Sequence, residues 1–427
     1  MSTLSDLDAI QKVFYVEDRL HKQFNQRSYL YDKLWKKWET DASGKSYTYA
    51  VHTSGLANAG SGYAEGGDFP AAATVGVANV VVPGTRLATT VELTGDIVRA
   101  ARGPGRGAFV SSARLTVEQA MRSFIHSINR QLHSDGRDAL AFWTAADNTS
   151  GTNVDDGQGN AFVHLPRAGT VTCDLIDATD NSTVLGNGIV VTRGANDDPN
   201  GVVAVTWTGS VAGSADADYL VLDGTLTNQL MGIRGIIDDA NPPLLAGGLH
   251  GLTVAAAPYW VAQVFENPAG AGTLRDLTLE LMQKPLTTIQ VETEFGEEDV
   301  KFLLCNGPVF DKYISLCIAQ KLQFNRMELD GGQSSVTFNN KPLVLDPQCR
   351  RNTIYYIVPD SMAVLTSSGG IIWAPVVDDG DQWVRKNAAA GAGYADAYQA
   401  QLVMYGGTAA KVRNANAALL DLDEALG

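Results

Sequence analysis

The sequence predicts an α+β protein with an all-β insertion, and three observations support this. Residues 116–133 have the spacing of an amphipathic helix, residues 46–85 show no helical period, and residues 169–226 alternate like short strands between Gly, Asn and Asp turns. The chain has 427 residues, 45% hydrophobic and 19% charged. This length and composition indicate two or three packed units and exclude a disordered chain.

Residues 5–38 are expected to form an N-terminal arm. Apolar side chains recur there at loosely helical spacing among charged ones, and the last of them are Leu34, Trp35 and Trp38. An amphipathic stripe of this kind needs a surface to pack against. We therefore expect an arm that packs on another element, not a separate domain.

Residues 46–85 are expected to form long extended strands around a Gly-rich tip. Between Ser46 and Thr85 the only charged residues are Glu65 and Asp68. Val82-Pro83-Gly84-Thr85 suits a type II turn, because Pro fixes φ and Gly accepts a positive φ. A stretch this long without a core of its own normally finds its contacts elsewhere, which in an oligomer means on a neighbour.

Residues 116–133 form the clearest helix in the sequence. Thr116 and Gln119 match a capping box, and Gly136 follows as a stop signal. Eighteen residues span about 27 Å. The polar face of this helix, which we expect in solvent, carries Arg122, His126, Arg130 and His133.

The insertion, residues 169–226, is strongly acidic. It carries eight Asp and one basic residue, Arg193, so its net charge is −7. Because burying unpaired carboxylates is costly, we expect these side chains in solvent. The whole chain has 32 basic and 47 acidic residues, a net charge of −15, which disfavours a dedicated DNA-binding protein.

The last third alternates helices and strands. We predict a helix at 273–284, and a second helix opened by Asn306-Gly307-Pro308 after a strand at 300–305. Further strands are predicted at 335–338, 341–345, 353–358, 362–365 and 399–406, followed by a closing helix from Thr408 to Leu426. The four cysteines are too few and too far apart for a disulfide framework, and we expect buried, reduced thiols.

The sequence offers no catalytic, cofactor-binding or metal-binding motif. The DASGKS segment at 41–46 lacks the first Gly of a P-loop, since position 39 is Glu, and the six histidines include no HExxH. The acidic cluster between Asp378 and Asp381 lacks EF-hand spacing. No stretch approaches the ~18 apolar residues of a membrane span, and the start lacks a signal-peptide pattern. We expect a non-enzymatic protein made in the cytosol, without a membrane partner.

The order of these elements resembles the major capsid proteins of tailed bacteriophages, which have the Hong Kong phage capsid fold. TYAVHTSGLANAGSGYAEGGDFPAA looks like that family's extended-loop tip, TRLATTVELTGDIVRAA like its return strand, and SFIHSINRQLHSDG like the end of its spine helix. VTFNNKPLVLDPQCRRNTIYYIVPDSMAVL and AYQAQLVMYGGTAAKVRNANAALLDL are similar to its late strands and its closing strand and helix. The resemblance covers nearly the whole chain except residues 169–226.

The resemblance implies a division of the chain and a set of contacts between subunits. The implied parts are an N-terminal arm (1–45), an extended loop or E-loop (46–110), a spine helix with peripheral domain (111–168), an inserted β-rich domain (169–226), an axial domain (227–375) and a return to the peripheral domain (376–427). The implied candidates for contacts between subunits are Trp35, Trp38, Tyr63, Glu65, Asp68 and Phe69.

The resemblance also implies a function. The chain would assemble with itself into hexamers and pentamers of an icosahedral virion shell, formed in the bacterial host cytoplasm. The shell would enclose double-stranded DNA without sequence-specific binding, and would work with a portal protein and with scaffolding or decoration proteins. The chain begins almost directly with the arm, so scaffolding is expected to be a separate protein or absent. No Lys lies between Gly55 and Pro70, so the Lys-to-Asn crosslink of some members is not expected there.

Two other interpretations remain open. An encapsulin-like compartment shell shares the fold and encloses enzymes in place of a genome, although the insertion and the long arm favour a virus. A secreted β-rich adhesin or carbohydrate-binding module would explain the composition of the insertion but not the helix or the arm.

Overall fold

The computed structural model describes most of the chain from residue 46 onward. The described residues are 46–54, 74–95, 106–143, 170–193, 217–245, 247–270, 272–320, 333–366 and 394–424, together with the short pieces 30, 33–34, 62–63, 65, 67–69, 154–155, 164–165, 205–208, 211, 326–329, 371–374 and 383–387. Trp35, Trp38 and the acidic cluster at 378–381 lie outside these residues.

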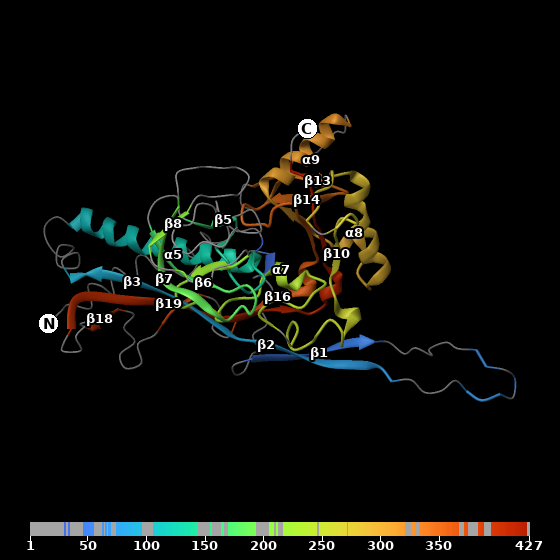
Figure 1. Cartoon of the computed structure of the whole chain (residues 1–427), viewed down its shortest axis with the longest axis horizontal. Helices are drawn as coiled ribbons and strands as arrows, with labels where there is room; N and C mark the ends of the chain where they lie inside the picture. Colours follow the sequence, from blue (N-terminus) through green and yellow to red (C-terminus); the bar gives the residue numbers. More distant parts are fainter. Residues whose placement is uncertain are drawn as a thin grey trace.

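A two-stranded ribbon extends away from the rest of the fold (Figure 1). β1 (Ser46–Ser54) pairs antiparallel with β2 (Gly76–Pro83), from Ser46 opposite Pro83 to Ser54 opposite Gly76. We call β1, β2 and the described residues 62–69 between them the extended hairpin. The predicted pair of extended strands is confirmed.

The predicted type II turn at Val82–Thr85 is wrong. β3 (Thr85–Thr94) follows β2 at once, and Gly84 lacks the positive φ that such a turn requires. The strand leaves one sheet at Pro83, opposite Ser46, and enters another at Thr85, opposite Gly406. Pro83 has no backbone N–H, so a change of sheet is a suitable place for it.

The second sheet is built around β19 (Tyr394–Ala410), a strand of 17 residues. β3 pairs antiparallel with β19 over ten residues, from Thr94 opposite Ala397 to Thr85 opposite Gly406. β16 (Met362–Thr366), β17 (Ile372–Trp373) and β18 (Val384–Asn387) also pair with β19. β19 thus joins β3, from a distant part of the chain, to three strands that precede β19 closely in sequence.

The long helix α5 (Arg106–His133) has 28 residues, which is about 42 Å. Its end agrees with the prediction, but its start does not, because Thr116 lies inside the helix. One face packs on β3 in the main hydrophobic core, through Val117, Phe124 and Ile128. Leu30 and Leu34 of the predicted arm are fully buried in that same core. Part of the arm therefore packs on its own chain.

A seven-stranded mixed sheet forms the second large unit. Its strand order is β10-β20-β15-β11-β14-β13-β12. The strands are β10 (Gln263–Phe265), β11 (Phe302–Cys305), β12 (Arg326–Leu329), β13 (Gln333–Phe338), β14 (Lys341–Leu345), β15 (Ile354–Ile357) and β20 (Ala417–Leu419). Helices α8 (Leu279–Glu292) and α9 (Gly307–Ala319) contribute to its hydrophobic core.

Two predicted helices in this region need correction. The helix predicted at 273–284 begins later, because Thr278 is its N-cap and its hydroxyl accepts from Leu281 N at 3.1 Å, and it continues through Pro285. The closing helix predicted at Thr408–Leu426 does not exist among the described residues. β19 runs to Ala410, and β20 then fills a place between β10 and β15. The Ala/Leu-rich composition favours a helix. Ala417–Leu419 nevertheless forms a strand, because it pairs with β10 on one side and β15 on the other.

The inserted segment belongs to a six-stranded sheet of order β5-β4-β9-β6-β7-β8. β6 (Thr170–Ile176), β7 (Val184–Arg193), β8 (Val205–Thr208) and β9 (Tyr219–Leu222) lie within the predicted insertion. β4 (Ala141–Trp143) and β5 (Val154–Asp155) precede it, and β4 pairs directly with β9. This sheet therefore starts well before residue 169.

The four cysteines are buried and none of them forms a disulfide, as predicted. Among the described residues no helix is both long enough and apolar enough to cross a membrane.

Candidate assembly surfaces

The tip of the extended hairpin presents two aromatic rings to solvent. Tyr63 and Phe69 are 59% and 78% exposed, and their ring centroids lie 4.9 Å apart. Glu65 and Asp68 beside them are exposed as well. Four of the predicted contact residues thus lie together, and an exposed aromatic pair bordered by acids is typical of a surface that a partner covers.

The stem of the hairpin has one buried and one exposed face. Tyr47, Tyr49 and Val51 of β1 pack against the main core, and the Tyr49 hydroxyl donates to the Ala410 carbonyl at 2.5 Å. Burial raises the pKa of Tyr49 well above its ordinary value, so its hydroxyl stays a donor. The stem is therefore fixed to the end of β19.

The opposite face of the stem is uncharged and exposed. Val77 and Val81 of β2 are 56% and 43% exposed, and they stand opposite His52 and Thr48 of β1. Neither strand contains Asp, Glu, Lys or Arg. The ribbon thus offers a second surface that desolvates at low electrostatic cost.

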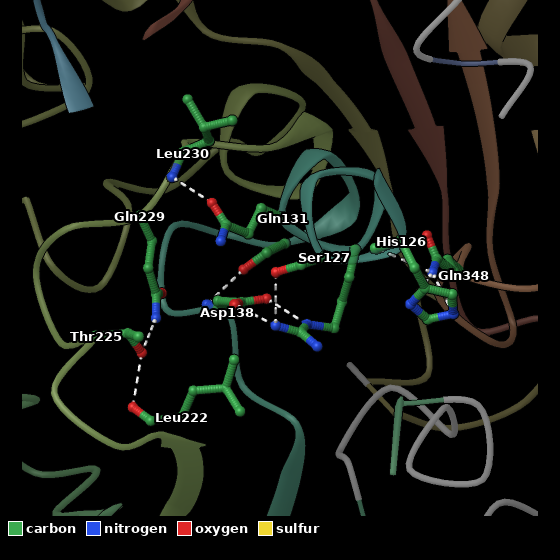
Figure 2. Close-up of polar contacts among 11 residues, drawn as sticks. His126, Ser127, Gln131, Asp138, Leu222, Thr225, Gln229, Leu230 and Gln348 are labelled. Carbon is green, nitrogen blue, oxygen red and sulfur yellow. Dashed lines mark hydrogen bonds and ion pairs between the residues drawn. The ribbon is translucent and has the colours of Figure 1, made fainter. Parts of the chain in front are cut away.

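At its C-terminal end, α5 carries a buried polar network that the sequence did not predict (Figure 2). Arg130 donates to both carboxylate oxygens of Asp138, each at 2.7 Å, and Gln131 Oε1 accepts from Leu230 N at 3.1 Å. Both members of the ion pair are at most 7% exposed. The prediction that Arg130 faces solvent is therefore wrong, because Asp138 in the following turn folds back onto the helix.

The same end of α5 reaches the seven-stranded sheet. His133 Nε2 lies 3.1 Å from Asp346 Oδ2, and Asn129 Nδ2 donates to Gln348 Oε1. Gln348 Nε2 also approaches the exposed ring of His126, which Figure 2 shows beside it. His133 is 3% exposed, so the prediction of a solvated His133 is wrong, whereas His126 and Arg122 are exposed as predicted.

The turn after α5 anchors the six-stranded sheet and the loop beyond it. Asp135 pairs with Arg137 at 2.7 Å and with Arg234 at 3.8 Å. Burial alone would raise the pKa of Asp135, but the two guanidinium groups lower it to about 2. The Arg137 guanidinium lies 5.0 Å from the ring centroid of Phe142 and 5.1 Å from that of Tyr219. Cation–π contacts thus link the turn after α5 to β4 and β9.

Two carboxylates of the acidic insertion are buried, contrary to prediction. Asp174 is 4% exposed and accepts from Gly188 N and Gly224 N, and Asp218 is 1% exposed and accepts from Ala178 N at 2.9 Å. Backbone N–H donors offset the cost of burial here. The sequence did not indicate this burial, because the donors lie 14, 50 and 40 positions from the carboxylates in the chain.

Comparison with known proteins identifies the fold. No protein-family profile matches the sequence, and no curated protein matches it. The capsid asymmetric unit of cyanophage A-1(L) is similar over 93% of both chains, with a TM-score of 0.55 and 13% identity. A structure of Mycobacterium phage Ogopogo covers 92% of both chains at a TM-score of 0.44 and 11% identity.

An encapsulin is also similar to this chain. The holo-SrpI encapsulin complex from Synechococcus elongatus PCC 7942 matches 93% of this chain and 88% of that chain, with a TM-score of 0.43 and 9% identity. The likeness to the cyanophage capsid confirms the predicted capsid fold over nearly the whole chain.

Proposed function

We propose that this chain is the structural subunit of a closed protein shell, the capsid of a tailed phage. The observation that carries the proposal is the match to the cyanophage A-1(L) capsid over 93% of both chains at a TM-score of 0.55. A fold by itself does not fix a function. The surfaces of the extended hairpin supply the second support.

The hairpin has the properties of an element that completes its contacts on another subunit. Its tip exposes Tyr63 and Phe69, and the outer face of its stem exposes Val77 and Val81 without any charged side chain. Such surfaces gain free energy when a neighbour covers them. In this proposal the tip lies across an adjacent subunit, and Glu65 and Asp68 fix its register there.

The finer assignments follow from the same proposal. The subunits form hexamers and pentamers of an icosahedral shell around double-stranded DNA, which they enclose without reading its sequence. Trp35 and Trp38 join the tip residues as contacts between subunits, and the predicted six-part division of the chain describes the subunit. The role requires no catalytic residue or cofactor.

We further propose that the acidic sheet faces outward. The segment 169–226 carries a net charge of −7, and Asp180 and Asp223 on it are exposed. Packed DNA would repel such a patch on the inner wall. An outward position is also where a decoration protein would bind.

Assembly of the purified chain tests the proposal. Light scattering and cryo-electron microscopy over a range of protein concentrations should reveal rings or megadalton shells. A compact monomer of 45.4 kDa at every concentration would contradict it.

The content of native particles separates the two kinds of shell. A virion capsid should protect double-stranded DNA of defined length from nuclease. An encapsulin-like shell should instead hold protein cargo and no genome.

A further inference from the structure

Three arginines gather around a single carboxylate at the turn after α5. Arg137 Nη2 and Arg234 Nη1 lie 2.7 Å and 3.8 Å from the same atom, Asp135 Oδ2. Arg350 lies in the loop between β14 and β15, close enough to Arg234 for the two charges to repel each other. We call these four residues the arginine cluster. Its three positive charges and one negative charge sum to +2, in a chain whose net charge is −15.

The packed backbone holds Arg234 beside the carboxylate. Arg234 belongs to the short helix α7 (Ile233–Ile236), and the residue before this helix is Gly232. A Cβ atom at Gly232 would lie 2.4 Å from the carbonyl oxygen of Gln131, so only glycine permits such a close approach of α7 to the end of α5. The position of Arg234 next to Asp135 is therefore fixed before any ligand arrives.

Asp135 satisfies only one of the three guanidinium groups. Its Oδ2 atom accepts from Arg137 Nε at 3.0 Å and from Arg137 Nη2 at 2.7 Å. Among the described residues the Arg234 guanidinium has no hydrogen-bond partner, and that of Arg350 has neither a hydrogen bond nor an ion pair. A guanidinium has five N–H donors and no acceptor, so most donors of this cluster are left for a ligand or for water.

The free donors can be reached from solvent. The side chains of Arg137 and Arg234 are 12% and 16% exposed, and Arg350 is half-buried. Nη1 is the only guanidinium nitrogen of Arg234 that is buried without a partner, so its Nε and Nη2 stay accessible. Arg137 Nη1 and the nitrogens of Arg350 are accessible in the same way. A ligand at the surface can therefore accept from all three arginines.

The positive charge of the cluster lacks a matching negative charge. Burial and the neighbouring charge of Arg350 lower the pKa of Arg234 to about 10, although Asp135 acts in the opposite direction, and the group stays cationic at pH 7. Asp238, the other carboxylate that Arg234 influences, forms no ion pair with it in the described part of the chain. Adjacent guanidinium groups repel each other, and an anion that contacts both of them relieves this repulsion.

We propose that the arginine cluster binds a divalent tetrahedral oxyanion of the phosphate class, either free phosphate or a phosphate monoester. Arg234 and Arg350 donate to separate oxygens of the anion, and Arg137 Nη1 donates to a third while Asp135 holds its other nitrogens. The forked N–H donors of arginine match phosphate oxygens, and a dianion compensates the net charge of +2. A carboxylate with one negative charge would compensate only half of it.

Calorimetric titration of the full-length chain at pH 7, in a buffer without phosphate or sulfate, tests the site. Inorganic phosphate and sulfate should bind, and acetate should bind more weakly by about tenfold or more. Arg234→Met and Arg350→Gln should each weaken phosphate binding by about tenfold or more. Arg122→Gln is the matched control, because Arg122 is an exposed arginine of α5 outside the cluster, and it should leave the affinity unchanged.

Thermal unfolding gives a second readout of the same site. A ligand that binds only the folded state raises the Tm, so excess phosphate should raise the Tm of the parent chain and of Arg122→Gln. It should not raise the Tm of Arg350→Gln. Because the Arg350 guanidinium has no hydrogen bond or ion pair to lose among the described residues, Arg350→Gln should fold and keeps the test decisive if Arg234→Met does not.

Three results would overturn the proposal. They are no phosphate binding to the folded chain, equal loss of binding in Arg122→Gln and Arg350→Gln, and acetate binding as tight as phosphate binding. The last result would instead indicate a carboxylate ligand, such as one from a neighbouring copy. Ethyl phosphate distinguishes the two sources: binding at least as tight as that of inorganic phosphate indicates a phosphate monoester, and weaker binding indicates free phosphate.

Discussion

His133, the last residue of α5, places its Nε2 atom 3.1 Å from Oδ2 of Asp346, a residue 213 positions later that directly follows β14. Both side chains are less than a tenth exposed. The pair therefore joins the long helix to the seven-stranded sheet inside the protein. Burial alone would raise the pKa of Asp346, but His133, Gln348 N and Asn129 hold it below its ordinary value.

The first prediction follows from this lowered pKa. The carboxylate is stabilised in the folded state, so its contribution is complete above the unfolded pKa of about 3.9 and is lost as the pH falls through the folded pKa. Asp346→Asn should cost about 3 kcal/mol at pH 7 and flatten the loss of stability below pH 4. Urea unfolding from pH 7 to pH 3 measures both effects. Glu292→Gln, at an exposed position of α8, is the control, and an unchanged acid slope in Asp346→Asn would contradict the prediction.

The buried pair of Arg130 and Asp138 gives the second prediction. Removal of one partner leaves an uncompensated charge, so Arg130→Met and Asp138→Asn should each cost about 3 to 5 kcal/mol. Asn is the suitable replacement, because residue 138 has a φ of 49°. The double variant should cost less than the sum by more than about 1 kcal/mol, measured by urea unfolding. Strict additivity would show that the two side chains do not act as a pair, and Arg122→Met, exposed on the same helix, should be nearly neutral.

The third prediction concerns the place where the strand changes sheet. A methyl group at Gly407 would lie 2.7 Å from the Pro83 carbonyl oxygen and 2.9 Å from a methyl group of Val82. Gly407→Ala should therefore push β2 away from β19 and cost about 1 to 3 kcal/mol. Thermal unfolding and hydrogen exchange of the hairpin stem measure this. Gly307→Ala is the control, since a methyl group there meets nothing within 4 Å, and equal destabilisation by both variants would contradict the prediction.

The fourth prediction separates assembly from folding. Tyr63→Ser and Phe69→Ser change side chains that are mostly exposed in the subunit, so each should alter the free energy of unfolding by less than about 0.5 kcal/mol. Both should reduce shell formation, which light scattering detects. Val291→Ser, at a side chain that is 74% exposed on α8, should leave assembly intact. Normal assembly of a variant that carries both Tyr63→Ser and Phe69→Ser would show that the tip does not contribute to the contact between subunits.

The fifth prediction concerns removal of the six-stranded sheet. A Gly/Ser linker in place of residues 169–226 leaves β4 without its partner β9 and exposes the buried Leu140 and Phe142, so this variant should aggregate. A linker in place of 140–226 removes the whole sheet and keeps Asp138 for Arg130. That variant should stay soluble and assemble, with a bump missing from the shell exterior in a cryo-electron microscopy map. If the variant that lacks 169–226 is more soluble than the variant that lacks 140–226, β4 does not depend on β9.

Local signals in the sequence predicted several elements well, and tertiary contacts explain the failures. β14 has the predicted bounds because alternation and turn residues are local properties. The segment 408–426 has helix-forming composition, yet its residues Ala417–Leu419 form β20, because the sheet offers a place between β10 and β15. Tertiary packing overrides propensity there.

Local sequence signals likewise predicted one of the candidate surfaces and missed the contacts that depend on tertiary structure. The low charge around Tyr63 and Phe69 is visible in the sequence, and the structure exposes both rings. The buried network of α5 was missed, because Asp346 and His133 are far apart in the chain and each alone looks like a solvated polar residue. Asp138 was missed because its partner Arg130 lies on a face that helical periodicity assigns to solvent.

The continuity of β2 and β3 determines how the hairpin carries mechanical load. A pull on the tip along the strand axis passes directly into β3, whose ten residues are paired with β19 side by side. Force along that axis shears all of these pairs together and does not open them one at a time. The hairpin is therefore a tether whose resistance to extension comes from the whole length of its anchoring strand.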